Sequence, residues 1–367
     1  MLKLIFSGIV TSSFLLITTS ISQAAIKVTE LASGLEHPWG IAFLPNGDAL
    51  ITERAGGLRK LSKNNELSAP ILGLPDAVAK GQGGTLGLAI SPNYDKDKLV
   101  YVCVNVERDN EWGSEVHAGM FDGQSLQDTK PVFIALPKAK SNYHFGCRVV
   151  FDNTGHLYVS LGDRGGFKDD AQSTDNHYGT VVRITSEGKV PSDNPFVSGT
   201  APEVYTYGHR NVQGMVKHPT TGAIWTHEHG PKGGDEVNIL SKGNNYGWPS
   251  ITYGVNYDGS IISEETKADS MEQPLKYWVP SFAPSGMTFY SGSEFPEWKN
   301  NLFIGSLKDR YLKRLVVEDG KIISEENLLA ERDERIRDVA QAPDGSLYVL
   351  TDSTDGKILR LSSADDK

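Results

Sequence analysis

The chain has 367 residues, 38% of them hydrophobic, and a formal net charge of −10 at pH 7. Such an acidic chain disfavours nucleic acids and anionic membranes as partners, so we expect a small or neutral ligand. Its length would suit two average domains, but one sequence pattern recurs nearly from end to end, so we expect a single large domain over residues 25–367.

The first 24 residues are typical of a secretory signal peptide. Lys3 precedes an apolar stretch from Leu4 to Ile21, and the small residue Ala24 marks a cleavage site before Ala25. A membrane anchor is the alternative, but serine and threonine interrupt the apolar run. We therefore expect a secreted or periplasmic mature chain without membrane insertion. Cleavage removes one lysine and no acidic residue, which changes the net charge from −10 to −11.

After the signal, one pattern occurs six times: a short apolar run, a turn and a second run rich in Val, Ile, Leu and Tyr. The copies begin at Gly40, Gly87, Arg148, Gly214, Gly286 and Asp338. Two strands joined by a turn cannot bury their apolar faces alone, so repeated hairpins are best arranged as blades around an axis. The pattern predicts an all-β fold, a six-bladed β-propeller. The copies are 47 to 72 residues apart, more than the roughly 40–45 of a minimal blade, so we expect long functional loops.

Cys103 and Cys147 are the only cysteines of the chain. In an oxidising compartment they can form a disulfide, which requires Cα atoms about 4.4–6.8 Å apart. The sequence does not give this distance, so two buried free thiols are an equal alternative.

Polar residues precede several of the predicted inner strands at the same phase of the repeat. The first strand of each propeller blade lines the channel, so these residues should gather at one channel mouth. They are Gln82, His144, Arg210, Asn211, Arg335 and Arg337, and we expect Lys308 to join them from a later loop. A single arginine is more simply a solvated charge or a structural ion pair. Several clustered cations would repel one another unless carboxylates or a polyanion neutralised them, so we predict a bound polycarboxylate or phosphate.

The hairpin register gives His144 an acidic partner. The turn from Asp152 to Gly155 is centred between residues 153 and 154, so His144 should face Asp163. A carboxylate beside an imidazole holds its tautomer and raises its basicity, as a general base near neutral pH requires. A purely structural pair is the alternative.

The segment from Thr226 to Asn238 is the densest run of potential metal ligands. His227 and His229 alternate as in a transition-metal site, but no third soft ligand is nearby, which argues against zinc or copper. A hard cation such as Ca²⁺ suits the remaining oxygen ligands better, namely Asp235, Glu236 and the turn carbonyls around Gly230 and Pro231.

Short motifs in a fixed order run along the whole mature chain. They are Gly81-Gln-Gly-Gly84 with Leu86-Gly-Leu88, His144-Phe-Gly146, Gly162-Asp-Arg-Gly165, Tyr207-Gly-His-Arg-Asn211, His229-Gly-Pro231 with Gly234-Asp-Glu236, Asn245-Tyr-Gly-Trp-Pro249 and Arg335-Ile-Arg-Asp338. This set resembles the soluble PQQ-dependent aldose sugar dehydrogenases. The resemblance implies a six-bladed propeller that holds pyrroloquinoline quinone (PQQ), a tricarboxylate o-quinone, together with Ca²⁺. It also implies oxidation of the anomeric hydroxyl of aldose sugars to lactones.

The resemblance implies roles for individual residues. His144 would be the general base, supported by Asp163. The implied cofactor contacts are Gln82, Arg210, Asn211, Tyr257, Lys308, Arg335 and Arg337. The implied calcium ligands are the carbonyls of Gly230 and Pro231 for the cofactor calcium, and Glu236 with the Tyr246 carbonyl for a structural site. Electrons would pass to an external acceptor, in the family a separate redox protein or a dye. Cys147 stands where the family usually has glycine, beside the histidine.

Substrate preference is less defined by the sequence. Trp39, Tyr143 and Trp248 are candidates for stacking on a sugar, although aromatic residues in a propeller are more often part of the core. No evident long insertion builds a dedicated glucose pocket, so we expect broad acceptance of aldoses. Two other classes share the fold. A calcium-dependent propeller lactonase or esterase would coordinate its metal with several inward Asp, Asn and Glu side chains, whereas the matching positions here are Arg, Asn and Gln. The fold does not exclude a propeller that only binds a ligand.

Overall fold

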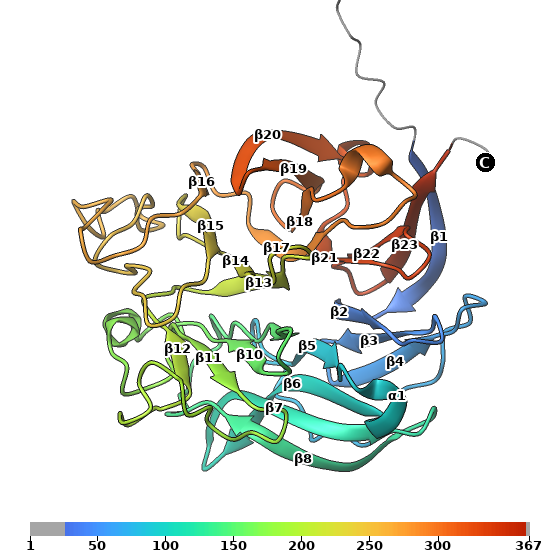
Figure 1. Ribbon diagram of the computed structural model, residues 1–367, viewed down its shortest axis with the longest axis horizontal. Coiled ribbons are helices and arrows are strands. Elements are labelled where there is room, and N and C mark those ends of the chain that lie inside the picture. Colours follow the sequence, from blue (N-terminus) through green and yellow to red (C-terminus); the bar gives the residue numbers. More distant parts are fainter. Residues whose placement is uncertain (1–25, 365–367) are drawn as a thin grey trace, which may run out of the picture.

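The computed structural model describes residues 26–364 as a nearly all-β molecule. Its strands form six sheets around a common centre, as Figure 1 shows. The six-bladed β-propeller predicted from the repeat is therefore confirmed. The expected signal peptide, residues 1–24, lies outside the described residues.

Each blade is an antiparallel sheet, numbered here in chain order. Blade 1 comprises β2 (Pro38–Phe43), β3 (Ala49–Glu53) and β4 (Gly57–Leu61). Blade 2 comprises β5 (Thr85–Ile90), β6 (Leu99–Arg108), β7 (Glu111–Phe121) and β8 (Leu126–Ile134). Blade 3 comprises β9 (Val149–Phe151), β10 (Leu157–Ser160), β11 (Val181–Ile184) and β12 (Val204–Thr206). Blade 4 comprises β13 (Val212–Lys217), β14 (Ile224–Glu228), β15 (Asp235–Ile239) and β16 (Lys276–Trp278). Blade 5 comprises β17 (Pro284–Phe289), β18 (Leu302–Ser306), β19 (Leu312–Glu318) and β20 (Lys321–Leu328). Blade 6 comprises β21 (Ile336–Gln341), β22 (Leu347–Thr351), β23 (Gly356–Ser363) and β1 (Ile26–Leu35).

In all six copies of the sequence pattern the first apolar run falls on the innermost strand of a blade. These strands are β2, β5, β9, β13, β17 and β21. Each of these strands packs against the innermost strands of the two neighbouring blades, which closes the ring around the channel. The residues beyond a minimal blade form long loops, as expected, including residues 161–180 and 240–275.

The ring is closed by the start of the described chain. β1 pairs with β23, with Val28 opposite Leu361, and becomes the outermost strand of blade 6. The last sheet therefore combines the first and the last strand of the described residues, an arrangement that the repeat pattern did not predict.

A buried ion pair crosses the channel. Arg148 Nη1 lies 3.0 Å from Asp338 Oδ1, and each residue starts one copy of the pattern, where the other four copies have glycine. Asp338 also accepts a hydrogen bond from Ile41 N, and Arg148 Nε donates to Gln213 O, so the pair links four blades. A Cβ atom at Gly286 would overlap the Asp338 carboxylate, so glycine is required at that position.

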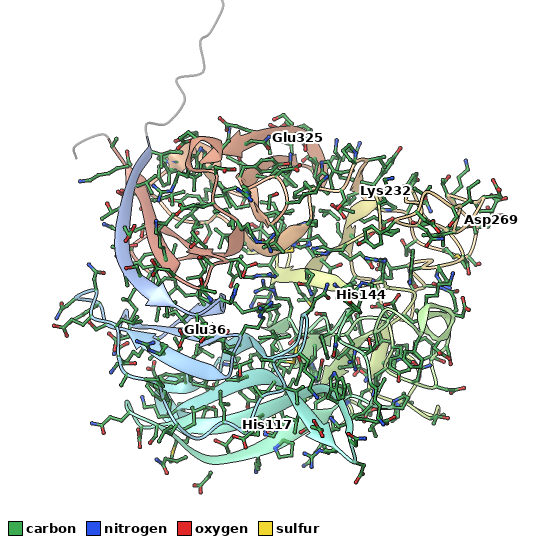
Figure 2. All side chains as sticks on the ribbon, turned by 180° about the vertical axis from the view of Figure 1, so that it is seen from behind. Glu36, His117, His144, Lys232, Asp269 and Glu325 are labelled. Carbon is green, nitrogen blue, oxygen red and sulfur yellow. A yellow bond between two sulfur atoms is a disulfide. The ribbon has the colours of Figure 1, made fainter. Side chains whose placement is uncertain are left out.

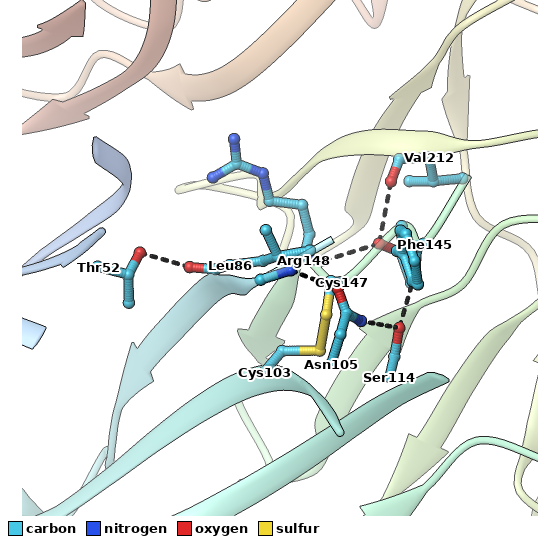
Figure 3. Close-up of a disulfide and its surroundings, with 12 residues drawn as sticks. Thr52, Leu86, Cys103, Asn105, Ser114, Phe145, Cys147, Arg148 and Val212 are labelled. Atoms are coloured by element: carbon cyan, nitrogen blue, oxygen red, sulfur yellow. Dashed lines mark hydrogen bonds between the residues drawn. A yellow bond between two sulfur atoms is a disulfide. The ribbon is translucent and has the colours of Figure 1, made fainter. Parts of the chain in front are cut away.

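Cys103 on β6 and Cys147, which precedes β9, form a disulfide with Cα atoms 5.7 Å apart (Figure 3). Of the two alternatives left open by the sequence, the structure therefore contains the bonded form. Both cysteines are fully buried, and the bond joins blade 2 to blade 3.

Helices contribute little to the fold. They are α1 (Tyr94–Asp97) and the 3₁₀ turns η1 (Lys168–Gln172), η2 (Pro296–Trp298) and η3 (Ala330–Arg332). Within residues 26–364, none of the helices has the length and apolar character needed to cross a membrane.

Candidate active site

Most of the predicted site residues lie in loops at one end of the channel. In an antiparallel blade, the start of the innermost strand and the end of the second strand lie at the same edge. His144 and Arg210 precede innermost strands, whereas Asp163 and Gly230 follow second strands. Figure 2 shows His144 near the centre of the ring. Residues far apart in the sequence therefore meet at this channel mouth.

The predicted contact between His144 and Asp163 is confirmed. His144 Nδ1 lies 2.5 Å from Asp163 Oδ1, and the Asp163 carboxylate is buried. Its second oxygen accepts a hydrogen bond of 2.8 Å from the Trp248 indole, and Gly165 N donates to the first. The carboxylate is thus fixed by two neighbours while it holds the imidazole.

The register used to predict this contact is wrong by one residue. Val149 pairs with Val159, so a regular strand would place His144 opposite the residue after Asp163. The regular strand begins only at Val149, and the preceding backbone turns, with φ of +50° at His144 and +76° at Cys147. This irregular segment redirects the His144 side chain to Asp163.

The pair has the charge state that a general base needs. Burial lowers the pKa of His144 below its ordinary value of 6.5, an effect that Arg210 and Arg164 reinforce and the hydrogen bond to Asp163 partly offsets. Burial opposes ionisation of Asp163, but the hydrogen bond from His144 lowers the pKa of this carboxyl below 3.8. Near neutral pH a neutral imidazole therefore donates Nδ1–H to a carboxylate and leaves Nε2 as a proton acceptor.

His144 faces a cavity of about 540 Å³. Six predicted site residues line it, namely Gln82, His144, Asp163, Arg210, Pro231 and Tyr257. Two of the three stacking candidates, Tyr143 and Trp248, also line it, and so do Gly165, Lys168 and Asn256. The general-base pair thus opens onto a space large enough for a small organic molecule.

A second cavity, of about 150 Å³, lies beside the first, because Gln82 lines both. It holds three further predicted residues, Asn211, Arg335 and Arg337. The third stacking candidate, Trp39, lines this deeper cavity, with the Arg148 guanidinium 4.1 Å from the centre of its ring.

Asp352 is a functional candidate that the sequence analysis missed. Its Oδ2 atom lies 2.7 Å from Arg335 Nη2 and 3.1 Å from Arg337 Nη2, and its Oδ1 atom lies 2.8 Å from His37 Nδ1. This carboxylate partly relieves the repulsion between the two guanidinium groups. Asp352 directly follows the second strand of blade 6, as Asp163 closely follows that of blade 3, so the repeat phase could have revealed it.

Arg210 satisfies its guanidinium with backbone oxygens instead of a carboxylate. Nη1 donates to the carbonyls of His229 and Gly230 at 3.1 and 3.0 Å, and the guanidinium carbon lies 5.4 Å from the centre of the Trp248 ring. Within residues 26–364 this guanidinium has no ion pair with an acidic side chain.

Lys308 does not join the other cations. Its Nζ atom donates to Ser281 O at 2.7 Å and lies 4.0 Å from an Asp309 carboxylate oxygen. Its side chain is 55% exposed, and it lines neither of the two cavities. The preceding residue, Leu307, does line the deeper cavity and accepts a hydrogen bond from Arg335. The prediction that Lys308 belongs to the cationic group is therefore not met by its side chain, which is exposed to solvent.

A third, smaller cavity brings together Gly230, Glu236 and Tyr246 with Glu228. In the part of the chain that the structure describes, Glu236 accepts one long hydrogen bond, 3.4 Å from Asn238. Burial and the charge of Glu228 raise the pKa of Glu236. An under-satisfied carboxylate of this kind fits a cation. Across residues 26–364 no three His, Cys, Asp or Glu side chains gather as metal ligands, so a metal here would depend on carbonyl oxygens.

The two histidines of the 226–238 segment contact different neighbours. His229 Nε2 lies 2.5 Å from Pro284 O. The ring of His227 is fully buried against Gly214, and neither of its nitrogens has a hydrogen-bond partner among the described residues.

Comparison with known proteins agrees with this geometry. The family profile described as Glucose / Sorbosone dehydrogenase matches residues 35–360. The chain is 43% identical over 350 residues to the aldose sugar dehydrogenase YliI of Escherichia coli, covering 93% of this chain and 94% of that protein. The apo-form crystal structure of the soluble aldose sugar dehydrogenase from E. coli superposes with a TM-score of 0.89 at 41% identity, over 92% of this chain and all of the other. The PQQ-bound aldose sugar dehydrogenase from Streptomyces coelicolor superposes with a TM-score of 0.78 at 26% identity, over 93% and 98% of the two chains.

Proposed function

Because the chain belongs to the glucose/sorbosone dehydrogenase family, we propose that it oxidises the anomeric hydroxyl of aldoses to lactones with PQQ and Ca²⁺ as cofactors. The observation that carries this proposal is the His144–Asp163 pair, which faces a cavity of about 540 Å³ beside the buried Arg337. The proposed general base and the arginine side chains proposed to bind an anion thus lie at the same channel mouth.

The residues of the two adjoining cavities fit a tricarboxylate. Arg335 and Arg337 share the single Asp352 carboxylate, and Arg210 has only carbonyl acceptors, so positive charge is in excess. The amides of Gln82 and Asn211 supply further polar contacts. These five residues would hold PQQ. Tyr257 at the open mouth and Lys308, in the loop directly after Leu307, would add further contacts.

Calcium fits the smaller cavity through oxygen ligands. Glu236 with the Tyr246 carbonyl would form one site, where a cation would satisfy the buried carboxylate. The carbonyls of Gly230 and Pro231 would form the cofactor site. Arg210 already donates to the Gly230 oxygen, and a guanidinium and a calcium ion on one carbonyl repel each other, so Arg210 would have to move aside.

The chemistry of the protein side chains follows from their geometry. When bound, PQQ supplies an o-quinone, polarised by calcium, that accepts the hydride from C1 of the sugar. His144 Nε2 takes the hydroxyl proton as the C1 carbonyl forms. Asp163 stabilises the resulting imidazolium, and the Trp248 indole keeps that carboxylate in place.

The remaining elements of the proposal concern substrate, acceptor and location. The large cavity is open and lined by the exposed Tyr143 and Tyr257, which supports acceptance of several aldoses. The two electrons would pass to an external acceptor. The signal-like first 24 residues support a site of action in the periplasm or outside the cell.

Reconstitution tests this proposal. Purified cofactor-free protein given PQQ and Ca²⁺ should reduce an artificial dye with glucose, xylose or galactose. H144A should still bind PQQ but lose roughly 10²–10⁴-fold in kcat, the usual contribution of a general base. R337A should instead weaken PQQ binding, measured by titration of the quinone absorbance. PQQ binding without turnover of any aldose, or hydrolysis of lactones without PQQ, would contradict the proposal.

A further inference from the structure

The proposed general base sits on a backbone segment that lacks regular structure. Residues 141–147, here called the His144 loop, lie between β8 and β9 and belong to neither strand. His144 and Cys147 both have positive φ, a conformation that side-chain-bearing residues rarely adopt. Strand pairing therefore does not explain why the imidazole points at Asp163, and other contacts must hold this loop.

The guanidinium of Arg164 supplies several of those contacts. Its Nη2 and Nε atoms donate to the carbonyls of Ser141 and Tyr143 at 2.5 and 3.2 Å. Its Nη1 atom donates to Trp112 O on β7 at 2.9 Å, and its carbon lies 4.1 Å from the centre of the Phe145 ring. The Arg164 carbonyl in turn accepts a hydrogen bond from Ser141 Oγ. One side chain thus ties three residues of the His144 loop to blade 2.

The contact with Tyr143 bears directly on His144, because the two residues share a peptide group. Arg164 binds the oxygen of that group, and the Gln82 side chain accepts its N–H from His144 at 2.8 Å. A peptide group is planar, so fixing both ends fixes the plane from which His144 projects. The preceding residue, Asp163, holds the imidazole at Nδ1.

Arg164 occupies this position at an electrostatic cost. The residue is 5% exposed, and within residues 26–364 its guanidinium forms no ion pair with a carboxylate. Burial lowers the pKa of Arg164 to about 10, so it remains a cation near neutral pH. A buried cation without an acidic partner is unfavourable unless carbonyl dipoles satisfy it, as three do here. Packing alone would be served by a neutral side chain.

We propose that Arg164 is a positioning residue for His144, acting through the peptide group between Tyr143 and His144 while Asp163 orients the ring. This inference rests on the proposed role of His144 as the base. Arg164 contacts neither cavity that would hold cofactor and substrate. Its loss should therefore reduce proton transfer and leave cofactor binding nearly unchanged.

The test compares R164Q and R164K with a matched control, R183Q. Arg183 lies on β11 of the same blade, is 6% exposed and stacks 5.4 Å from the centre of the Tyr205 ring, but it pairs with Asp193 and does not contact the His144 loop. R164Q should lower kcat by about tenfold or more, since a displacement of about 1 Å can cost 10²-fold. The sugar KM and the Kd of PQQ should change little. R164K should recover part of kcat, and R183Q should change none of these values.

A second readout needs no cofactor. The charged groups that act on the imidazole are Asp163, Arg210 and Arg164. Burial and the two arginines lower the pKa of His144, whereas Asp163 raises it. NMR titration of cofactor-free R164Q should show the pKa of His144 rising towards 6.5, because the ring gains solvent and loses one positive neighbour, with H144Q used for assignment. If R164Q leaves both kcat and the pKa of His144 unchanged, the inference is wrong. If R164Q does not fold, the same two measurements on R164K test the inference. A wild-type protein that oxidises no aldose would refute the proposed function, whereas the titration would still test positioning.

Discussion

The His144 imidazole is subject to two opposing effects, burial and a carboxylate partner. Burial favours its neutral form, and Asp163 favours the protonated form that arises during proton transfer. The pair therefore keeps a base neutral at rest without making it a poor proton acceptor. Two further groups support the pair. The Trp248 indole holds the carboxylate, and Arg164 holds the backbone beside His144 without lining either cavity.

Replacing Asp163 by Asn removes the carboxylate charge and should lower the pKa of His144. In cofactor-free protein the pKa of His144 should lie below 6.5, and in D163N it should fall further, because the contribution that raises it is lost. NMR titration measures both values. The kcat of reconstituted D163N should fall by about 10²–10⁴-fold, since Asn cannot stabilise an imidazolium. A pKa that rises in D163N would contradict this account.

Asp352 should stabilise the protein most when no polyanion is bound. D352N leaves Arg335 and Arg337 without their shared carboxylate. The Arg335 side chain is 42% exposed, so the cost comes mainly from Arg337, whose pair with Asp352 is buried. Breaking a buried pair costs about 3–5 kcal/mol, so the cofactor-free protein should lose about that much unfolding free energy. Bound PQQ would then neutralise the two cations, so the increase in Tm on PQQ addition should be larger in D352N than in wild type.

A control for D352N lies in the same blade. D344N removes a surface ion pair with Arg360, whose side chains are 51% and 35% exposed, and should cost no more than about 1 kcal/mol. Calorimetry with and without PQQ compares the two variants. Equal PQQ-induced shifts in wild type and D352N would show that Asp352 does not offset the cofactor-binding arginines.

At the scale of elements, the site is built where loops enter the innermost strands. The six hairpins were recognisable in the sequence because each carries its own apolar runs and turn. The phase of the polar residues then placed Gln82, Arg210 and Arg337 at one mouth, since every blade repeats the same strand order. Lys308 was assigned to this group from its loop and not from this phase. It follows a second strand, as Asp163 and Asp352 do, but its side chain is 55% exposed and lines neither cavity.

The Cys103–Cys147 bond should stabilise blades 2 and 3 and steady the His144 loop. The cysteines are 44 residues apart, so the chain-entropy model gives about 4 kcal/mol for the cross-link. The double variant C103A/C147A should lose unfolding free energy of this order in denaturant titrations. Because Cys147 ends the His144 loop, kcat should also fall while the Kd of PQQ changes little. Wild-type kcat in the double variant would limit the bond to a structural role.

For the whole molecule, closure of the ring depends on β1. This strand covers the outer edge of β23, and an uncovered edge is a template for association with other chains. Deletion of residues 26–33 should therefore lower Tm and produce oligomers, which light scattering would detect.

A point substitution separates packing from strand pairing. Val28 packs against the apolar core of blades 5 and 6. V28D should destabilise the protein by about 1–3 kcal/mol, because it places a charge against apolar side chains, whereas V28T should have a smaller effect.

If the variant that lacks residues 26–33 remains monomeric with wild-type Tm, blade 6 is stable with three strands, the number that blade 1 has.

The sequence by itself determined the hairpin repeat, the propeller, and most of the residues at the channel mouth. These features are local or periodic: an apolar run and a turn specify a strand pair, and a fixed phase within the repeat specifies one end of the channel. The His144–Asp163 contact was also within reach, although the register was off by one residue because the backbone leaves regular strand geometry before Val149.

Only the tertiary structure decided how these residues are held. The Asp352 counter-ion, the Arg164 contacts, the Arg148–Asp338 pair and the closure by β1 join segments that have no local pattern in common. Each depends on the direction of a side chain and on the distance between blades, and both are set by packing of the complete ring. The sequence therefore specified which chemical groups reach the site, and folding specified which of them neutralise, orient and support one another.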